Sequence, residues 1–198
     1  MRVLRDKLST GGVDPTIGAK DTFTFGEGNY RVIAGAGDET IEIGSGTNFV
    51  IGDAGRITFN SDFTTTIESI AASVIGNDIV TVSEGDNVIV GGSGTDTITV
   101  MAVADSTTSR TTILGDNGRL TVSSTGTLLA IESTDFDYGA TDQVNLTTGI
   151  NTVIGGVGVD QITTSNGVNT ILGDDGKATF LADGTLQLIE SINLGNGA

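Results

Sequence analysis

A nine-residue unit with the pattern Gly-x-[Asp/Asn]-x-[Val/Ile/Phe] recurs fifteen times in this chain of 198 residues, and it constrains the fold more than any other feature. The units start at Ala19, Gly28, Gly37, Gly46 and Gly55, at Gly76, Gly85, Gly94, Ser109 and Gly118, and at Ala140, Gly149, Gly158, Gly167 and Gly176. An apolar residue follows four positions after every start. A unit this short cannot bury an apolar face alone, so neighbouring units must stack into a solenoid.

The composition favours strands and a cationic partner. Thirty glycines, a single proline and no helical periodicity indicate many short strands joined by tight turns. The 25 acidic and 9 basic residues give a net charge of −16, which disfavours nucleic acid and favours cations such as Ca²⁺. The absence of cysteine and histidine removes thiolate metal sites and the commonest general base. Residues 1–8 resemble neither a signal peptide nor a membrane span, so we expect no membrane insertion.

Each run of five units closes with a similar segment, which defines a longer superrepeat. The segments are Ile-Gly-Asp-Ala-Gly-Arg at 51–56, Leu-Gly-Asp-Asn-Gly-Arg at 114–119 and Leu-Gly-Asp-Asp-Gly-Lys at 172–177. Two alternating apolar stretches separated by turn residues follow each segment and predict a β-hairpin. The expected divisions are the end of a preceding hairpin at 1–18 and superrepeats at 19–75, 76–139 and 140–198, with a six-residue insertion at 103–108.

The expected fold is all-β: a parallel β-roll solenoid of about fifteen nonapeptide half-turns in three superrepeats, each followed by a β-hairpin. Even units carry an apolar residue at the outward strand position, at Ile33, Ile51, Val90, Leu114, Ile154 and Leu172. Such a row would form a larger patch than a monomer usually exposes. We expect the hairpins to cover it through Phe63 and Ile67, through Leu128, Leu129 and Ile131, and through Leu186, Leu188 and Ile189. The alternative is a face for lateral association.

The third position of the units alternates with a period of eighteen and separates acids from amides. Odd units carry Asp21, Glu39, Asp78, Asp96, Asp142 and Asp160 there, whereas even units carry Asn48, Asn87, Asn151 and Asn169, with Tyr30 and Thr111 as exceptions. Two units therefore make one turn, and we expect the stacked acid pairs Asp21–Glu39, Asp78–Asp96 and Asp142–Asp160 to lie one strand spacing apart, about 4.8 Å. Carboxylates this close repel unless a cation separates them, and Ca²⁺, with oxygen ligands at about 2.3–2.6 Å, suits the gap.

Residues 91–99 and 155–163 resemble the calcium-binding nonapeptide G-G-x-G-x-D-x-U-x of the repeats-in-toxin (RTX) family at every fixed position. The resemblance implies a parallel β-roll whose glycine turns give carbonyl oxygens, and whose aspartates give carboxylate oxygens, to Ca²⁺. Carried over to this chain, it implies the ligands Gly91, Gly92, Gly94, Asp96, Gly155, Gly156, Gly158 and Asp160, with partial matches at Gly35, Gly37 and Glu39. Asparagine replaces aspartate on the even edge, so we expect Ca²⁺ on the odd edge.

The fifth unit of each superrepeat carries its acid four residues early, at Asp53, Asp116 and Asp174. The basic residues Arg56, Arg119 and Lys177 follow them. One interpretation is that these acids cap the calcium row of the preceding odd turn. The other is a Gly-Asp turn whose carboxylate holds its own backbone and pairs loosely with the basic residue.

These features favour a non-catalytic, calcium-stabilised structural segment of a large secreted or cell-surface bacterial protein of the adhesin, matrix or filament type. Its expected partners are calcium ions and neighbouring superrepeats, with end-to-end or lateral self-association. One alternative is a carbohydrate- or ice-binding flat face, although the turn positions are irregular. The other is a carbohydrate-active enzyme with paired carboxylates, which stacked acids without a cleft and a chain without tryptophan disfavour.

Overall fold

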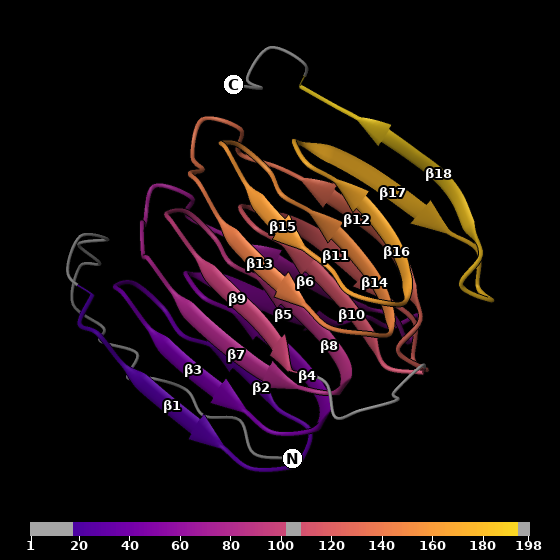
Figure 1. Cartoon of the computed structure of the whole chain (residues 1–198), viewed down its shortest axis with the longest axis horizontal. Helices are drawn as coiled ribbons and strands as arrows, with labels where there is room; N and C mark the ends of the chain where they lie inside the picture. Colours follow the sequence, from indigo (N-terminus) through magenta and orange to yellow (C-terminus); the bar gives the residue numbers. More distant parts are fainter. Residues whose placement is uncertain (1–17, 102–107, 194–198) are drawn as a thin grey trace.

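The chain forms three stacked sheets. A computed structural model describes residues 18–101 and 108–193, and these residues form eighteen strands and no helix. The strands make two parallel sheets and one antiparallel sheet of six strands each (Figure 1). In this part of the chain no helix has the length and hydropathy needed to span a bilayer.

Two parallel sheets form the walls of the roll. The odd sheet contains, in spatial order, β1 (Thr22–Phe25), β3 (Thr40–Ile43), β7 (Ile79–Ser83), β9 (Thr97–Met101), β13 (Gln143–Leu146) and β15 (Gln161–Thr163). The even sheet contains β2 (Arg31–Ile33), β4 (Gly46–Ile51), β8 (Gly85–Val90), β10 (Arg110–Leu114), β14 (Ile150–Ile154) and β16 (Val168–Leu172). The chain alternates between the two sheets, so two units make one turn, as the period of eighteen predicts.

The third sheet, called the hairpin sheet, is built from three antiparallel hairpins. They are β5 (Gly55–Phe59) with β6 (Thr65–Ser69), β11 (Gly118–Val122) with β12 (Leu128–Ser133), and β17 (Gly176–Phe180) with β18 (Leu186–Ser191). The expected all-β roll with interspersed hairpins is confirmed. The fifth unit of each superrepeat differs from expectation, because it forms the first hairpin strand and not a half-turn of the roll. Ile57, Leu120 and Ala178 occupy its third position and pack in or against the second core.

The roll continues without a break past each hairpin. Ile41 of β3 pairs with Val80 of β7, and Val50 of β4 pairs with Ile89 of β8, although the first hairpin lies between them in the sequence. The hairpins therefore loop out from a single column of turns. Residues 1–17 and all of the insertion at 103–108 except its last residue lie outside the described residues. The boundaries at 75/76 and 139/140 remain a prediction.

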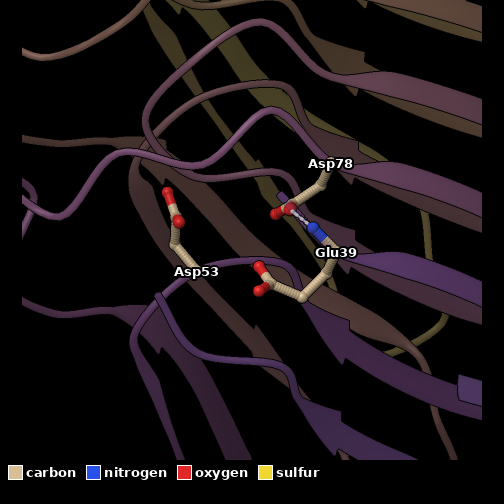
Figure 2. Close-up of side chains that lie close together, drawn as sticks. All are labelled: Glu39, Asp53 and Asp78. Atoms are coloured by element: carbon tan, nitrogen blue, oxygen red, sulfur yellow. Dashed lines mark hydrogen bonds between the residues drawn. The ribbon is translucent and has the colours of Figure 1, made fainter. Parts of the chain in front are cut away.

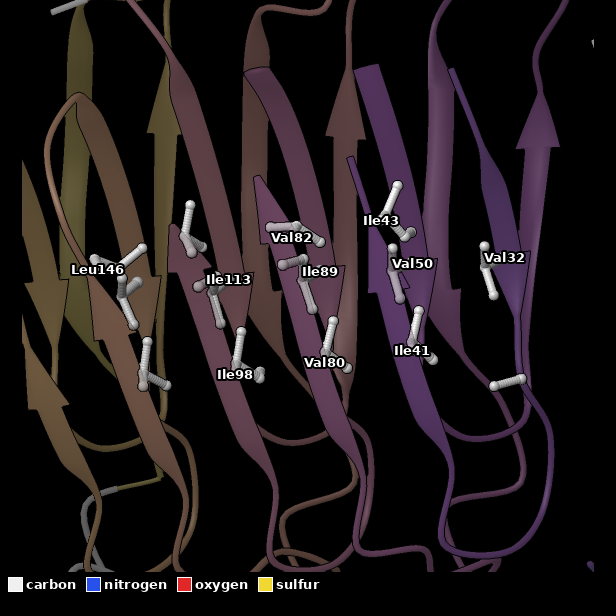
Figure 3. Packing of buried hydrophobic residues seen from close by; sticks show 14 residues of the cluster. Val32, Ile41, Ile43, Val50, Val80, Val82, Ile89, Ile98, Ile113 and Leu146 are labelled. Carbon is white, nitrogen blue, oxygen red and sulfur yellow. The ribbon is translucent and has the colours of Figure 1, made fainter. Parts of the chain in front are cut away.

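The first hydrophobic core fills the interior of the roll. Its side chains come from the inward positions of both parallel sheets and stack in rows along the solenoid axis (Figure 3). Ile41, Val80 and Ile98 of the odd sheet lie against Val50 and Ile89 of the even sheet, and all five are fully buried. Burial of a side chain of this size contributes about 1.5–3 kcal/mol, so the repeated apolar position stabilises every turn.

The second core lies between the even sheet and the hairpin sheet. It contains the outward apolar row of the even sheet, with Ile51, Val90, Leu114 and Ile154 fully buried and Ile33 and Leu172 partly buried. Ile67, Leu120 and Ile131 of the hairpins cover this row, which confirms the expected cover.

Other hairpin side chains do not provide the expected cover. Phe63 is 79% exposed, and Leu186, Leu188 and Ile189 are each about 40% exposed. Phe63 lies at a hairpin tip, and β18 lies beyond the last strand of the even sheet, at the end of the hairpin sheet (Figure 1). Leu129 is half-buried and lies outside this core.

Candidate metal centre

The acids of the odd units form one continuous row along the turns that lead into the odd sheet. From Glu39 onward, the backbone N–H of each acid donates to the carboxylate of the next one: Glu39 to Asp78 at 2.8 Å, Asp78 to Asp96 at 2.8 Å, Asp96 to Asp142 at 2.8 Å and Asp142 to Asp160 at 2.9 Å. From the sequence, these acids are expected in separate pairs. The row is continuous because each hairpin loops out and brings the next superrepeat into register.

Each acid of the row uses only part of its hydrogen-bonding capacity. The Oδ1 atoms of the aspartates accept the N–H groups of the row, whereas the second oxygens are buried without a partner. These are Oδ2 of Asp78, Asp96, Asp142 and Asp160 and both carboxylate oxygens of Glu39. A buried carboxylate oxygen that accepts no hydrogen bond is costly, so the row has the donor set that a hard cation requires.

Three carboxylates converge at the first hairpin. Glu39, Asp53 and Asp78 are buried, and one oxygen of each lies within 4.8 Å of the others. Figure 2 shows the three side chains pointing toward a common space at the turn. Oxygen ligands of Ca²⁺ lie about 2.3–2.6 Å from the ion, so two of them on opposite sides are separated by about 5 Å. The spacing of this cluster therefore fits Ca²⁺.

Burial raises the pKa of the acids from Glu39 to Asp160 in the row and that of Asp53. The pKa of Glu39 is raised to about 9, that of Asp53 to about 8 and that of Asp142 to about 8, with desolvation as the largest cause. Burial also raises the pKa of Asp78 and Asp96, and neighbouring carboxylates add to the effect at Glu39 and Asp96. A cation among these groups would favour their ionised forms.

Asp53 and Asp116 join turns that are distant in sequence. Asp53 Oδ2 accepts the N–H of Ser93 at 2.6 Å, and Asp116 Oδ2 accepts the N–H of Val157 at 2.6 Å. Asp116 Oδ1 also accepts the N–H of Ala140, where the chain returns from the second hairpin, at 3.1 Å. Each carboxylate therefore holds the next turn in place, which neither sequence interpretation anticipates.

The contacts of Asp53 separate the two interpretations further. Its Oδ1 is buried without a partner beside Glu39 and Asp78, which supports a capping role in the acid row. The basic residue does not pair with it, because Arg56 Nε binds Glu68 Oε1 across the hairpin at 2.9 Å. Lys177 likewise pairs with Glu190.

The acids at the two ends of the row have different surroundings. Asp174, the counterpart of Asp53 in the third superrepeat, is exposed. At the other end, Asp21 is half-buried, and its charge contributes to the raised pKa of Glu39. Asp160 is half-buried, and burial raises its pKa to about 6.

The glycines expected in calcium turns lie where either a positive φ or a lack of space for a Cβ favours glycine. Gly92 and Gly156 have φ of +116° and +111°, and a Cβ at either position would contact the carboxylate of Asp53 or Asp116. Gly35, Gly37, Gly94 and Gly158 also have positive φ. A Cβ at Gly91 or Gly155 would contact Oδ2 of Asp96 or Asp160 and a neighbouring glycine carbonyl. Carboxylate and carbonyl oxygens thus approach one another at these turns.

The opposite edge of the roll carries the expected amide ladder. Asn48 Nδ2 donates to Asn87 Oδ1 at 2.9 Å, and Asn151 Nδ2 donates to Asn169 Oδ1 at 2.8 Å. Thr111 lies between the two pairs, and Asn151 Oδ1 is buried without a partner. These side chains are neutral, so this ladder carries no charge that a cation would have to balance.

One buried polar position next to the metal row is not apparent from the sequence. Asn117 follows Asp116 and donates to Ser93 Oγ at 2.7 Å and to the carbonyl of Tyr138 at 2.8 Å. Its counterpart Asp175 is also buried and accepts from Asn193 at 3.0 Å. Asn117 and Asp175 each directly follow a Gly-Asp pair. This shared position in the sequence is the signal that could have identified both residues.

Comparison with protein families identifies the repeat. The family model of the RTX calcium-binding nonapeptide repeat (4 copies) matches residues 74–105 and 146–179. These segments contain Asp78, Asp96 and Asp160 of the acid row. No curated protein and no solved structure matches the chain.

Proposed function

Because this chain carries RTX calcium-binding nonapeptide repeats, we propose that Ca²⁺ locks it into a rigid structural segment of a large secreted or cell-surface protein of the adhesin, matrix or filament type. RTX nonapeptide repeats bind calcium, and the chain is a calcium-binding structural repeat region. The residues proposed to hold the ion are Glu39, Asp53 and Asp78, whose carboxylates converge. By their equivalent sequence positions one superrepeat later and their burial, Asp96, Asp116 and Asp142 are proposed as a second set.

The observation that carries this proposal is the set of buried carboxylate oxygens without partners. In the absence of a cation, Glu39, Asp53 and Asp78 must either be protonated or repel one another. A bound Ca²⁺ removes the repulsion and links the turn before the hairpin to the turn after it. Metal binding is thereby coupled to folding of the roll.

A structural role suits these acids better than catalysis. Asp78, Asp96 and Asp142 are each at most 1% exposed, so a polymeric substrate could not reach their carboxylates. A glycosidase needs two carboxyl groups on either side of an accessible bond. Burial of the row inside the turns supports a role in holding the fold.

The proposed extracellular location is compatible with the same role. Extracellular calcium modules bind with dissociation constants of about 10⁻⁴–10⁻³ M, a range in which the ion stabilises a fold only outside the cell. The proposed segment stays loosely folded during export and becomes rigid where Ca²⁺ is abundant.

The end of the roll supports self-association with a further superrepeat or a second copy. In the described part of the chain, β15 and β16 are terminal strands of the two parallel sheets, and β18 is terminal in the hairpin sheet. Unpaired strand edges invite pairing, and Leu186 and Leu188 expose apolar surface beside them. Small-angle scattering should give a longer particle in calcium than in EDTA; a compact sphere in both conditions would contradict stacking.

Thermal unfolding tests the proposed function. Melting followed by circular dichroism should shift upward by several degrees in about 10 mM CaCl₂ relative to EDTA, because an ion present at 100 times a dissociation constant of about 10⁻⁴ M adds about 2.7 kcal/mol. MgCl₂ serves as the control, since Mg²⁺ requires shorter bonds and octahedral geometry. Identical melting curves in calcium and EDTA would overturn the proposal.

A further inference from the structure

A cavity of about 450 Å³ lies outside the metal row, between the tips of the first two hairpins and the beginnings of three even strands. Its lining includes Arg31 at the start of β2, Thr47 near the start of β4 and Asp86 near the start of β8. The remaining lining comes mainly from the first tip, with Phe59 and Phe63, and from the second tip at 123–126. Small-molecule sites occupy about 300–1,000 Å³, so this cavity has the size of a ligand site.

Phe63 departs from the repeat at a position that favours glycine. The three hairpin tips share one turn, in which the N–H of Phe63, Gly126 or Gly184 donates to the carbonyl three residues before it. The φ angles are +65°, +82° and +86°, a region that a bulky side chain rarely adopts. Phe63 is nevertheless 79% exposed, so no packing in the fold explains an aromatic ring here. Backbone strain of this kind is found where a side chain contacts a ligand.

Arg31 also departs from the repeat. Its equivalents in the second and third superrepeats are Val88 and Thr152. The guanidinium lies over the ring of Phe49, 4.5 Å from its centroid, and makes one long bond of 3.5 Å to the carbonyl of Thr47. Neither ion pair in the described part of the chain includes Arg31, so the guanidinium keeps donors for another partner.

Asp86 is the third departure from the repeat at this cavity. Its equivalents are Asn29 and Ile150. Its carboxylate faces the second hairpin tip, where a Cβ built on Gly126 would lie 4.0 Å from Asp86 Oδ2. The cavity therefore combines the Arg31 guanidinium, which only donates hydrogen bonds, with the Asp86 carboxylate, which only accepts them. It also presents two exposed aromatic rings, Phe59 and Phe63.

We propose that this cavity binds a neutral saccharide, with Phe59 and Phe63 against the apolar face of a sugar ring and Arg31 and Asp86 bound to its hydroxyl groups. A hydroxyl group both donates and accepts, so adjacent hydroxyls satisfy Arg31 and Asp86 together. An anionic ligand would suit Arg31 but is repelled by Asp86 and by the net charge of −16. The site is independent of the calcium row, because none of its residues belongs to that row.

Calorimetric titration of the calcium-loaded full chain with neutral oligosaccharides tests this proposal. The probes are glucose, galactose, mannose and N-acetylglucosamine oligomers, with oligogalacturonate as the acidic comparison. At least one neutral oligomer should bind and oligogalacturonate should not. The variant Phe63→Gly, which introduces the residue of the sister hairpins, should weaken binding by at least about fivefold. The same variant should melt at the same or a higher temperature, since it removes a strained φ.

The variants Arg31→Val and Asp86→Asn also introduce residues found at the equivalent repeat positions, and each should weaken binding. Tyr138→Thr is the matched control, because it removes an exposed aromatic ring outside the cavity, and it should bind like the unmodified chain. The proposal would be overturned if none of the neutral oligomers bound, or if oligogalacturonate alone bound. It would also be overturned if Phe63→Gly bound the neutral oligomer as tightly as the unmodified chain.

Discussion

The carboxylate of Asp53 accepts a 2.6 Å hydrogen bond from the backbone N–H of Ser93, which lies 40 residues further along the chain. The same side chain comes within 4.8 Å of the carboxylates of Glu39 and Asp78. Asp53 therefore connects the start of the hairpin, the following turn and the acid row. Asp116 repeats the arrangement with Val157 in the second superrepeat.

Asp53→Asn is expected to weaken calcium binding at the first cluster by at least about tenfold. The amide keeps the size of the side chain and an oxygen that can accept from Ser93, but it removes a charged ligand. Calcium titration followed by melting temperature measures the effect. Asp174→Asn is the control, because Asp174 has the equivalent sequence position but is exposed, and it should bind calcium normally. Equal losses in both variants would exclude a specific role for Asp53.

The stability of the calcium-free protein should fall as pH rises from about 4 to about 9. Burial raises the pKa of Asp53 to about 8 and those of Glu39 and Asp116 to about 9, whereas ordinary carboxyl pKa values are near 4. Between these limits the folded state holds more protons than the unfolded state, so raising the pH removes stability. Melting in EDTA across this range measures the slope.

Calcium should flatten this pH dependence, because the ion favours the ionised carboxylates and its binding releases protons. Calorimetry in buffers of different ionisation enthalpy measures the proton release. A calcium-free protein that gains stability between pH 5 and pH 8 would show that the acids are not held in a desolvated row.

Ser69→Ala should lower the free energy of unfolding by about 1–3 kcal/mol. Ser69 Oγ accepts the N–H of Gly118 at 2.9 Å and is buried between the first two hairpins. The alanine variant leaves that N–H without an acceptor. Ser61→Ala, at the exposed first tip, should change stability by less than about 0.5 kcal/mol. Urea unfolding of both variants measures the difference, and equal stabilities would contradict the link between hairpins.

Ile131→Ala should cost about 2–5 kcal/mol, because Ile131 is fully buried in the second core. Ile189 has the equivalent place in the third hairpin but is 39% exposed on β18, so Ile189→Ala should cost about 1 kcal/mol or less. Urea unfolding compares the two. Similar losses would show that β18 is covered as completely as β12.

Much of the fold follows from the nonapeptide pattern. The apolar position at Ile41 and Val50 fixes the interior, and the alternation of Asp78 with Asn87 fixes two turns of opposite character on the two edges. These features are local and periodic, so they can be read without the structure. The cover of the even sheet was also predictable, because its outward apolar row needed a partner.

Other features depend on contacts between distant segments. The meeting of Glu39 with Asp78 requires the hairpin to loop out and the roll to close across it. The exposure of Phe63 at a strained φ and the cavity beside it depend on how hairpin tips meet the even strands. Periodicity describes what repeats, whereas these sites are formed by residues that break the repeat.

A crystal structure of the chain grown in millimolar CaCl₂, with anomalous scattering used to locate the ion, tests the central claim most directly. We predict an anomalous peak between the carboxylates of Glu39, Asp53 and Asp78, with oxygen distances of about 2.3–2.6 Å, and none along the amide ladder at Asn48 and Asn87. Clear density for these side chains with no peak between them would contradict the account.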